Sequence, residues 1–384
     1  NVELVVEEAL IEEINTVPDD ITGTVKLKGS INGAPISLDL SKLNITPIVE
    51  VVGQVTVTDF DLNELGELLA EVLDPFVGKA GIDGNVNFRM EGSDIGAAYD
   101  GSISLNDADL GGTGWATAGT LSYEGKLSYD MKLPQIAIAV DGDLRAQKYT
   151  FNMPEPKIDL GNEDILISGR TTVDIIGGVN VESTASLTLA PTTYIAEGMK
   201  AGAGDTSWAG QILFNTAKKD EPLAVKLDGQ LSIAEPSFNL MQEKGEMEVG
   251  NNLLSWDGKF EYGLNQGDAG GSYVKTDGVF LAKETFFKQP ESVEVKQSEL
   301  KIAGVSEVGL GKETAVTYSG DVDLGKSDVL MGDIAISEES ISWKGDLSYT
   351  LKDTAQLVGL KGSLDVDGVA FDMAGPGLHV SQDK

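Results

Sequence analysis

The amino-acid sequence predicts an all-β protein built from an elongated, curved and repeated antiparallel β-sheet. Three segments share one pattern, with apolar residues at every second position and one glycine in the apolar register: 121–129, 254–262 and 341–349. Alternation with a period of two is typical of a strand with one apolar and one solvated face. Recurrence of one motif along a long chain indicates that a structural unit is repeated.

The composition agrees with this fold class. The chain has 46 Gly, 12 Pro and no Cys, with Val, Ile, Thr and Leu in short runs. Glycine within a strand gives up side-chain packing, so its repeated use indicates a sheet that curves. Alternation alone leaves two arrangements open, an open groove or a sandwich-like packing on a second sheet. Asp-Gly pairs are expected either to close hairpins or to lie within strands; they include 83–84, 141–142, 228–229, 257–258, 277–278 and 367–368.

The spacing of the glycines supports a repeat. Gly101, Gly125 and Gly142 are separated by 24 and 17 residues, and a second cluster is separated by 25 and 17, namely Gly320, Gly345 and Gly362. The two clusters are offset by 219 to 220 residues, since 320 minus 101 is 219 and 345 minus 125 is 220. The near-constant offset predicts duplication of a block of several strands.

Two stretches depart from the β pattern. The run 2–17 fits either a helix or a strand. Residues 61–76 predict one short amphipathic helix, because the leucines share one helical face, Asp61 and Glu64 form a capping box, and Pro75 ends the segment. We interpret residues 1–384 as one elongated repeated β array, a fragment of a longer protein. A candidate seam lies at 152–156, where two prolines interrupt the strands.

The charge restricts the partners. With 62 acidic and 28 basic residues, the chain has a formal charge of −34. Nucleic-acid binding needs clustered positive charge, so this class is excluded, and anionic membrane surfaces repel the chain. An acidic solvated face keeps a long sheet soluble. No apolar run approaches the ~18 residues of a transmembrane segment.

The sequence predicts no enzyme, cofactor or metal site. The single histidine, His379, is expected to be solvent-exposed, and no G-x-S-x-G motif or Cys/His cluster accompanies it. Closely spaced carboxylates fit a solvated strand face better than a calcium loop, although calcium binding is left open. These pairs are Asp107 with Asp109, Asp321 with Asp323, and Asp365 with Asp367.

The apolar face of the repeated strands is the candidate site. It is expected either to pack under a second sheet or to line a trough in which lipid acyl chains replace that sheet. The candidate groove residues are Tyr123, Leu127, Tyr129, Trp256, Phe260, Tyr262, Trp343, Leu347 and Tyr349.

The alternating apolar pattern of the strands, with its glycine, resembles that of the AsmA-like family of bacterial envelope proteins. Segments 99–129, 254–264 and 318–351 carry the resemblance, and 55–88 is similar to that family's strand, short helix, strand arrangement. The resemblance implies a curved β-sheet in the periplasm, a hydrophobic groove for phospholipid chains as in bridge-like lipid-transfer proteins, and no catalytic residues. This sequence lacks the amino-terminal membrane helix typical of the family.

The expected function is therefore non-enzymatic. A periplasmic or cell-envelope protein would shield or transfer lipid acyl chains along a hydrophobic β-groove, with phospholipid or other lipid tails and envelope membrane proteins as partners and a role in outer-membrane biogenesis. The alternative is a structural β-repeat module with a closed core, such as a surface filament, an adhesin or a scaffold for secretion or outer-membrane assembly. That protein would be secreted or displayed on the cell surface. A carbohydrate-active β protein is a third, weaker alternative.

Overall fold

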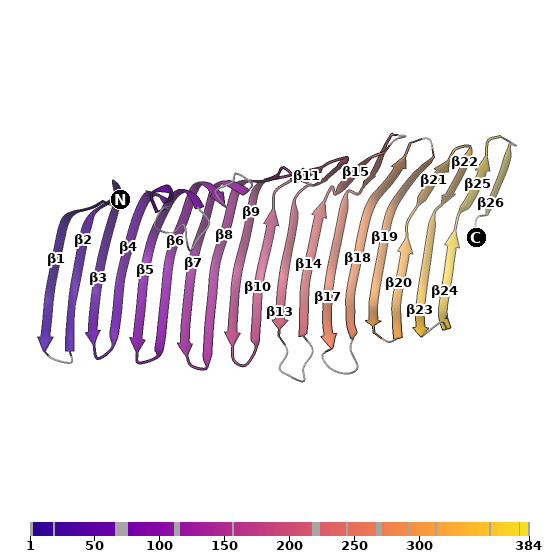
Figure 1. Ribbon diagram of the computed structural model, residues 1–384. Helices are drawn as coiled ribbons and strands as arrows, with labels where there is room; N and C mark the ends of the chain where they lie inside the picture. The colour runs from indigo at the N-terminus through magenta and orange to yellow at the C-terminus, as the bar shows by residue number, and fades with distance from the viewer. Residues whose placement is uncertain are drawn as a thin grey trace. The chain divides into compact units, whose positions relative to one another are not determined.

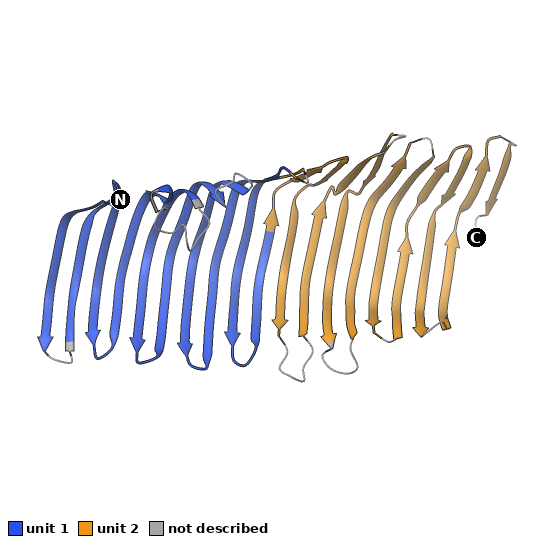
Figure 2. Ribbon diagram, in the orientation of Figure 1, with its two compact units in different colours: residues 1–154, 161–187 blue, residues 155–160, 188–384 orange. Residues whose placement is uncertain are grey.

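The computed structural model is an antiparallel β protein, which confirms the predicted fold class (Figure 1). It describes residues 3–17, 20–65, 76–110, 116–155, 157–216, 223–242, 245–265, 271–290, 292–311, 313–352, 355–375 and 377–382. The chain divides into two compact units, residues 1–154 with 161–187 and residues 155–160 with 188–384 (Figure 2). The seam at 152–156 remains a prediction. The described residues contain no helix long and apolar enough to cross a membrane.

Unit 1 is an antiparallel meander in which each strand pairs with the next along the chain. The ambiguous amino-terminal run forms a strand, β1, rather than a helix. The strands are β1 (Leu4–Val17), β2 (Asp20–Ile31), β3 (Ala34–Thr46), β4 (Val49–Asp61), β5 (Phe76–Glu91), β6 (Asp94–Leu110), β7 (Ala116–Lys132), β8 (Gln135–Met153), β9 (Ile158–Ile175) and β10 (Val179–Leu189).

Unit 2 contains a row of long strands and a set of shorter strands. The long strands pair in the order β13 (Thr206–Asn215), β14 (Leu223–Ala234), β17 (Leu253–Asn265), β18 (Gly271–Gln289), β19 (Val293–Leu310), β20 (Glu313–Leu324), β23 (Ser340–Lys352) and β24 (Ala355–Asp367). The far ends of β18 and β19 pair with β16 and β21, which belong to the shorter set. That set is β11 (Thr192–Ala196), β12 (Met199–Ala203), β15 (Ser237–Gln242), β16 (Gly245–Gly250), β21 (Ser327–Met331), β22 (Ile334–Glu338), β25 (Val369–Met373) and β26 (Leu378–Gln382).

The repeated unit is a pair of consecutive strands with two glycines facing each other. These cross-strand pairs are Gly84–Gly101, Gly125–Gly142, Gly210–Gly229, Gly258–Gly278, Gly304–Gly320 and Gly345–Gly362. From Gly210 to Gly345 the first glycines are spaced by 48, 46 and 41 residues, as subtraction of their numbers shows. The two glycine clusters of the sequence thus occupy equivalent positions, each on three adjacent strands.

Close approach of the paired backbones explains why glycine occupies these facing positions. A Cβ atom on Gly125 would overlap the carbonyl oxygen of Asp141 and lie 2.6 Å from the Cα atom of Gly142. Real Cβ atoms do not tolerate such contacts, so these strands meet only because neither residue has a side chain.

The Asp-Gly pairs close no hairpin among the described turns. All but one lie within strands, and Asp367-Gly368 lies between β24 and β25. The hairpin between β2 and β3 turns instead at Asn32 and Gly33, whose φ angles are 49° and 83°. Positive φ at both central residues is typical of the type I′ turn that Asn-Gly favours, so this dipeptide is the turn signal in the sequence.

The predicted helix at 61–76 is not seen as an α-helix in the described residues. Only a 3-10 turn, η1 (Leu62–Leu65), follows β4, and residues 66–75 lie outside the described part. Asp61 does act as a cap, because its carboxylate accepts a 2.9 Å hydrogen bond from the backbone N–H of Asn63.

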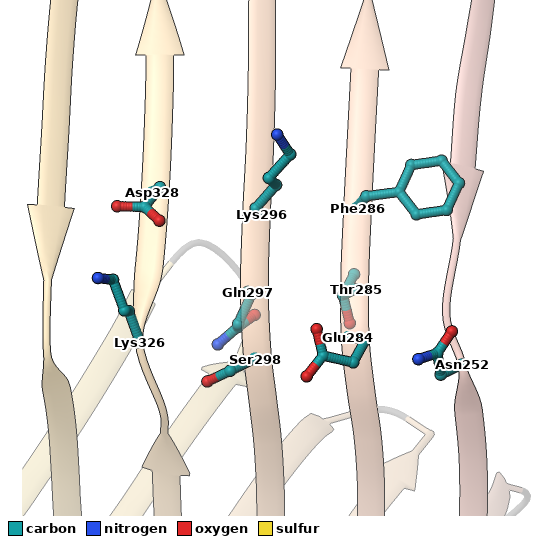
Figure 3. A pocket seen from close by; sticks show the side chains of 9 residues that line it. All are labelled: Asn252, Glu284, Thr285, Phe286, Lys296, Gln297, Ser298, Lys326 and Asp328. Carbon is teal, nitrogen blue, oxygen red and sulfur yellow. The ribbon is translucent and has the colours of Figure 1, made fainter.

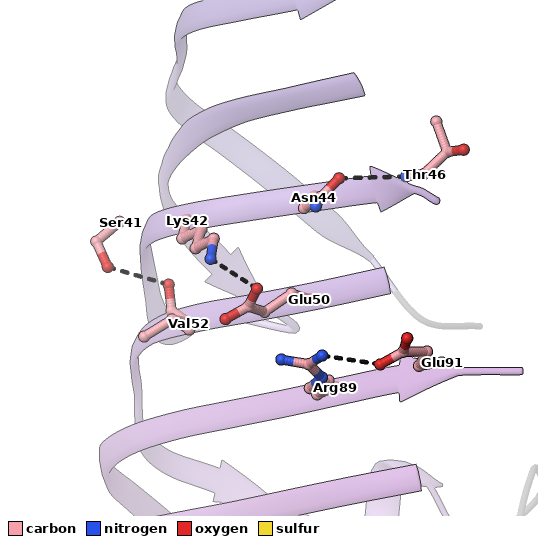
Figure 4. Close-up of polar contacts among 8 residues, drawn as sticks. All are labelled: Ser41, Lys42, Asn44, Thr46, Glu50, Val52, Arg89 and Glu91. Carbon is pink, nitrogen blue, oxygen red and sulfur yellow. Dashed lines mark hydrogen bonds and ion pairs between the residues drawn. The ribbon is translucent and has the colours of Figure 1, made fainter. Parts of the chain in front are cut away.

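The strands bend within each unit, as the predicted curvature requires. In unit 1, Ser41 is an extra residue between the register pairs of Leu40 and Lys42, and its hydroxyl donates to the Val52 carbonyl across the bend (Figure 4). Further along the strands, non-glycine residues adopt left-handed backbone conformations with φ between 46° and 55°; they include Glu13, Asp59, Asp107 and Lys148 in unit 1 and Glu235 and Glu284 in unit 2.

Little of the described chain is deeply buried. The buried apolar residues are Ala34, Leu40, Phe60, Ala108, Ala118 and Ala282, and no large side chain is fully buried in the described part. Each unit, taken by itself, thus consists of strands paired side by side without a thick core between two layers.

Candidate functional site

The nine predicted groove residues lie at equivalent positions on three strands. Tyr123, Leu127 and Tyr129 lie on β7 in unit 1, and the other six lie on β17 and β23 in unit 2. Eight are half-buried, and Leu347 is 37% exposed. Because none is deeply buried, the structure places them on an accessible apolar face rather than in a closed interior.

Strand register aligns the unit 2 residues although three strands separate β17 from β23. Trp256 and Trp343 lie on one transverse row of paired apolar residues, with Phe280, Ile302 and Val322 between them. Tyr262 and Tyr349 end a second row, through Val274, Val308 and Val316. These two rows are apolar across the long strands of unit 2. The row between Phe260 and Leu347 is not, because it passes through Thr276 and Ser306, whose hydroxyls share a 2.7 Å hydrogen bond.

In unit 1 the motif lines an open hollow of about 320 Å³. Leu127 and Tyr129 contribute side chains from β7, with Tyr99 from β6 on one side and Ile138 and Val140 from β8 on the other. These flanking residues lie outside the copies of the glycine motif, so the motif alone does not predict them. Apolar alternation in 95–105 and 136–144 was the signal that identifies them.

An aromatic side chain lies two residues before one glycine of each facing pair. The six are Tyr99, Tyr123, Trp208, Trp256, Tyr318 and Trp343, one for every pair. A Cβ atom on Gly84 would lie 2.7 Å from the ring of Tyr99, and one on Gly278 would lie 2.9 Å from Trp256. The rings therefore lie over the glycine backbones and restore part of the apolar contact that glycine gives up.

The three tyrosines of this group make the same hydrogen bonds. Each phenol donates to the carbonyl of the residue three positions ahead, at 2.6 Å for Tyr99, 2.9 Å for Tyr123 and 2.9 Å for Tyr318. Each also reaches the partner strand, at the carbonyl that precedes its glycine; the acceptors are Asp83, Asp141 and Ala303 at 3.2, 3.3 and 3.1 Å. The phenols thus satisfy backbone carbonyls on an otherwise apolar face.

Burial raises the pKa of Tyr99, Tyr123 and Tyr318 above the ordinary value of 10.0. The folded protein keeps these phenols neutral to higher pH than the unfolded chain does. Their contribution to stability is therefore complete below the unfolded pKa of 10.0. It is lost as the pH rises through the folded pKa.

We expect an alkaline titration, monitored by phenolate absorbance, to show that some of the 9 tyrosines ionise at higher pH than the others. Replacing Tyr99, Tyr123 and Tyr318 by phenylalanine should remove most of that group. Tyr273 should remain late, since its hydrogen bond to Glu261 raises its pKa. A single transition for all tyrosines at the ordinary value would contradict the burial of these phenols.

The opposite face of the strands is charged and solvated. Lys126, Lys259 and Lys344 pair across strands with Asp100, Asp228 and Asp321 at 3.4, 3.8 and 3.1 Å, and all of these side chains are well exposed. Exposed pairs of this kind contribute about 0–1 kcal/mol each. They favour strand register and solubility more than they stabilise the fold.

Arg145 and Asp164 form a bidentate ion pair on this face. The guanidinium donates two hydrogen bonds to the carboxylate, at 2.6 and 2.8 Å, from β8 to β9. These hydrogen bonds lower the pKa of the Asp164 carboxyl.

A second hollow, of about 520 Å³, lies beside the strand irregularity at Glu284 in unit 2 (Figure 3). Glu284 and Asp328 face Lys296 and Lys326 around it, so charges of both signs balance. Such a site does not select ions of one sign.

The other predicted polar groups have ordinary surroundings. No group of three or more His, Cys, Asp or Glu side chains suited to a metal ion occurs in the described part of the chain. Asp323 accepts a 2.7 Å hydrogen bond from Ser342, and Asp321 pairs with Lys344. His379 is exposed, as expected, but lies on strand β26, where it contacts Asp372.

Comparison of the sequence with models of known protein families finds no match, and comparison with curated proteins finds none either.

Proposed function

We propose that this protein binds lipid acyl chains along the apolar faces of its two β units, as a non-enzymatic protein of the cell envelope that shields or transfers lipids. The observation that carries the proposal is the accessible apolar face. Large apolar side chains recur there on both sides of the row of facing glycines, and the described residues bury no large side chain completely.

The energetics of such binding need no residue-specific chemistry. Each methylene group that is fully buried contributes about 0.8 kcal/mol, and one that is partly covered contributes in proportion to the area removed from water. The hollow between β6, β7 and β8 offers almost only apolar contacts, and the Tyr99 and Tyr123 hydroxyls are already occupied by backbone carbonyls. A face of this kind prefers lipids by their tails rather than by their headgroups.

The periplasmic location and the role in outer-membrane biogenesis rest on the resemblance to AsmA-like proteins. The alternative, a structural module with a closed core, needs a second layer over the apolar faces. Within each unit the described strands pair side by side and supply no such layer.

The test is native mass spectrometry of protein purified without detergent, followed by organic extraction and lipid identification. We expect stoichiometric phospholipid on the purified chain, or uptake of pyrene-labelled phosphatidylcholine by chain from which lipid has been removed. A folded protein that carries no lipid and takes up no labelled lipid would contradict the proposal and favour the structural module.

A further inference from the structure

We propose that two pairs of hydroxyl side chains on the apolar faces donate hydrogen bonds to the ester carbonyl oxygens of a bound glycerolipid. The inference rests on the lipid binding proposed above and identifies the polar group that the bound lipid carries. The pairs are Thr171 with Ser183 in unit 1 and Thr276 with Ser306 in unit 2, and their hydroxyl oxygens lie 2.8 and 2.7 Å apart. All four side chains are half-buried.

In unit 2 the hydroxyl pair interrupts a row of apolar side chains. Thr276 on β18 lies opposite Ser306 on β19, and their neighbours in the row are Phe260 and Tyr318. Beyond these the row continues with leucine on β14, β23 and β24. The phenol of Tyr318 already donates to backbone carbonyls, so the hydroxyl pair is the polar point of this row that a ligand can reach.

Unit 1 has the same arrangement on β9 and β10. Thr171 occurs two positions after Gly169, and Ser183 occurs two positions before Ala185. A Cβ atom on Gly169 would lie 2.6 Å from the Cα atom of Ala185, so these two small residues face each other closely. The pair in unit 2 likewise lies two positions from facing glycines. Recurrence of the same residue types at this position indicates a feature of the repeat.

Each hydroxyl pair has one hydrogen-bond donor more than it uses. A hydroxyl group has one O–H donor and two acceptor lone pairs. The bond within the pair uses one donor, and the described residues provide no acceptor for the other. When hydrocarbon covers the pair and excludes water, the second donor is left unsatisfied, which weakens binding. A carbonyl oxygen at this place restores the hydrogen bond.

The position of the pairs favours a ligand over a purely structural role. A hydroxyl pair that only joins two strands can lie on the polar side, as Thr117 and Thr150 do at 2.7 Å in the row of Asp109. On the apolar face, valine and alanine would bury apolar area and leave no donor unsatisfied. A glycerolipid supplies both the hydrocarbon that the face binds and the carbonyl oxygens that the hydroxyls accept as partners.

Competition between two phosphatidylcholines tests the inference. One has two ester-linked oleoyl chains and the other has two ether-linked oleyl chains, so they share a headgroup and differ in the carbonyl oxygens. An equimolar mixture in vesicles is offered to lipid-free protein, and each bound lipid is quantified by native mass spectrometry. We expect about fivefold more ester lipid than ether lipid on the protein, the effect of one net hydrogen bond.

This preference should disappear when the four hydroxyl residues are replaced together, through Thr171→Val, Ser183→Ala, Thr276→Val and Ser306→Ala. Binding of the ether lipid should not fall, because no donor is then left unsatisfied. The matched control, Thr117→Val with Thr150→Val, removes the pair on the polar side and should keep the preference of about fivefold. Circular dichroism checks folding. If the fourfold variant does not fold, the two-residue variant of either unit should still lower the preference.

Two outcomes separate this inference from the proposed function. Equal binding of both lipids to the unaltered protein, or a preference that persists in the folded variants, would overturn the role of the hydroxyl pairs and leave acyl-chain binding supported. Binding of neither lipid would overturn the proposed function and this inference with it.

Discussion

Replacing Leu127, Phe260 and Leu347 by glutamate should abolish lipid binding while the β fold persists. These side chains follow the glycine of each motif copy by two positions, on the apolar face of β7, β17 and β23. A carboxylate there is incompatible with an acyl chain lying against it, because contact with the chain removes water from the charge. Since each position is only partly buried in the free protein, the charge keeps contact with water and the fold tolerates it.

The measurement is phospholipid content by native mass spectrometry, with circular dichroism as the check of folding. A matched control adds the same charges to the same strands on their polar face, through Ser122→Glu, Ser255→Glu and Ser348→Glu. The control should retain lipid. Unfolding of the first variant alone would show a closed apolar core, and equal lipid content in both variants would show that these faces do not bind lipid.

The second large effect should come from the facing glycines. We expect Gly125→Ala to destabilise the protein by about 3 kcal/mol, the upper range for overpacking. Its Cβ atom would overlap the Asp141 carbonyl oxygen, and the φ angle of 150° is unfavourable for a residue with a side chain. Neither neighbour can move away easily, because both belong to the backbone of the paired strand.

Chemical denaturation monitored by circular dichroism measures this change in the free energy of unfolding. Gly96→Ala is the matched control, because Gly96 lies on the adjacent strand β6 and a Cβ atom there meets nothing within 4 Å. Its effect should stay within about 0.5 kcal/mol. Similar losses for the two variants would show that strand glycines act through conformational freedom rather than through close approach.

Several features of the fold follow from local patterns alone. Alternation in 121–129, 254–262 and 341–349 predicted strands with one apolar face, and β7, β17 and β23 confirm it. The offset between the glycine clusters predicted a repeat. In the structure the repeated unit is a pair of consecutive strands with facing glycines. The run 2–17 could not be assigned, because five glutamates among apolar residues fit both periodicities until β2 provided a partner.

Other features depended on partners distant in the chain. By its local sequence an Asp-Gly dipeptide predicts a hairpin turn. Gly142 and Gly278 instead lie within strands, where each faces a glycine on the neighbouring strand. Tyr99, Ile138 and Val140 join the hollow only through register with β7. The nine groove residues remain predictions as binding residues, although within each unit the structure places its members on an accessible face.

The sequence by itself determined the strand class, the polarity of the two faces, the repeat and the absence of cysteine chemistry. These are properties of residue type and of a period of two, which neighbouring residues express without any tertiary contact. Only the tertiary structure decided which glycines face each other, where the aromatic rings lie and whether the apolar faces are covered. Each of these depends on the register between strands, and hydrogen bonds between distant segments set that register.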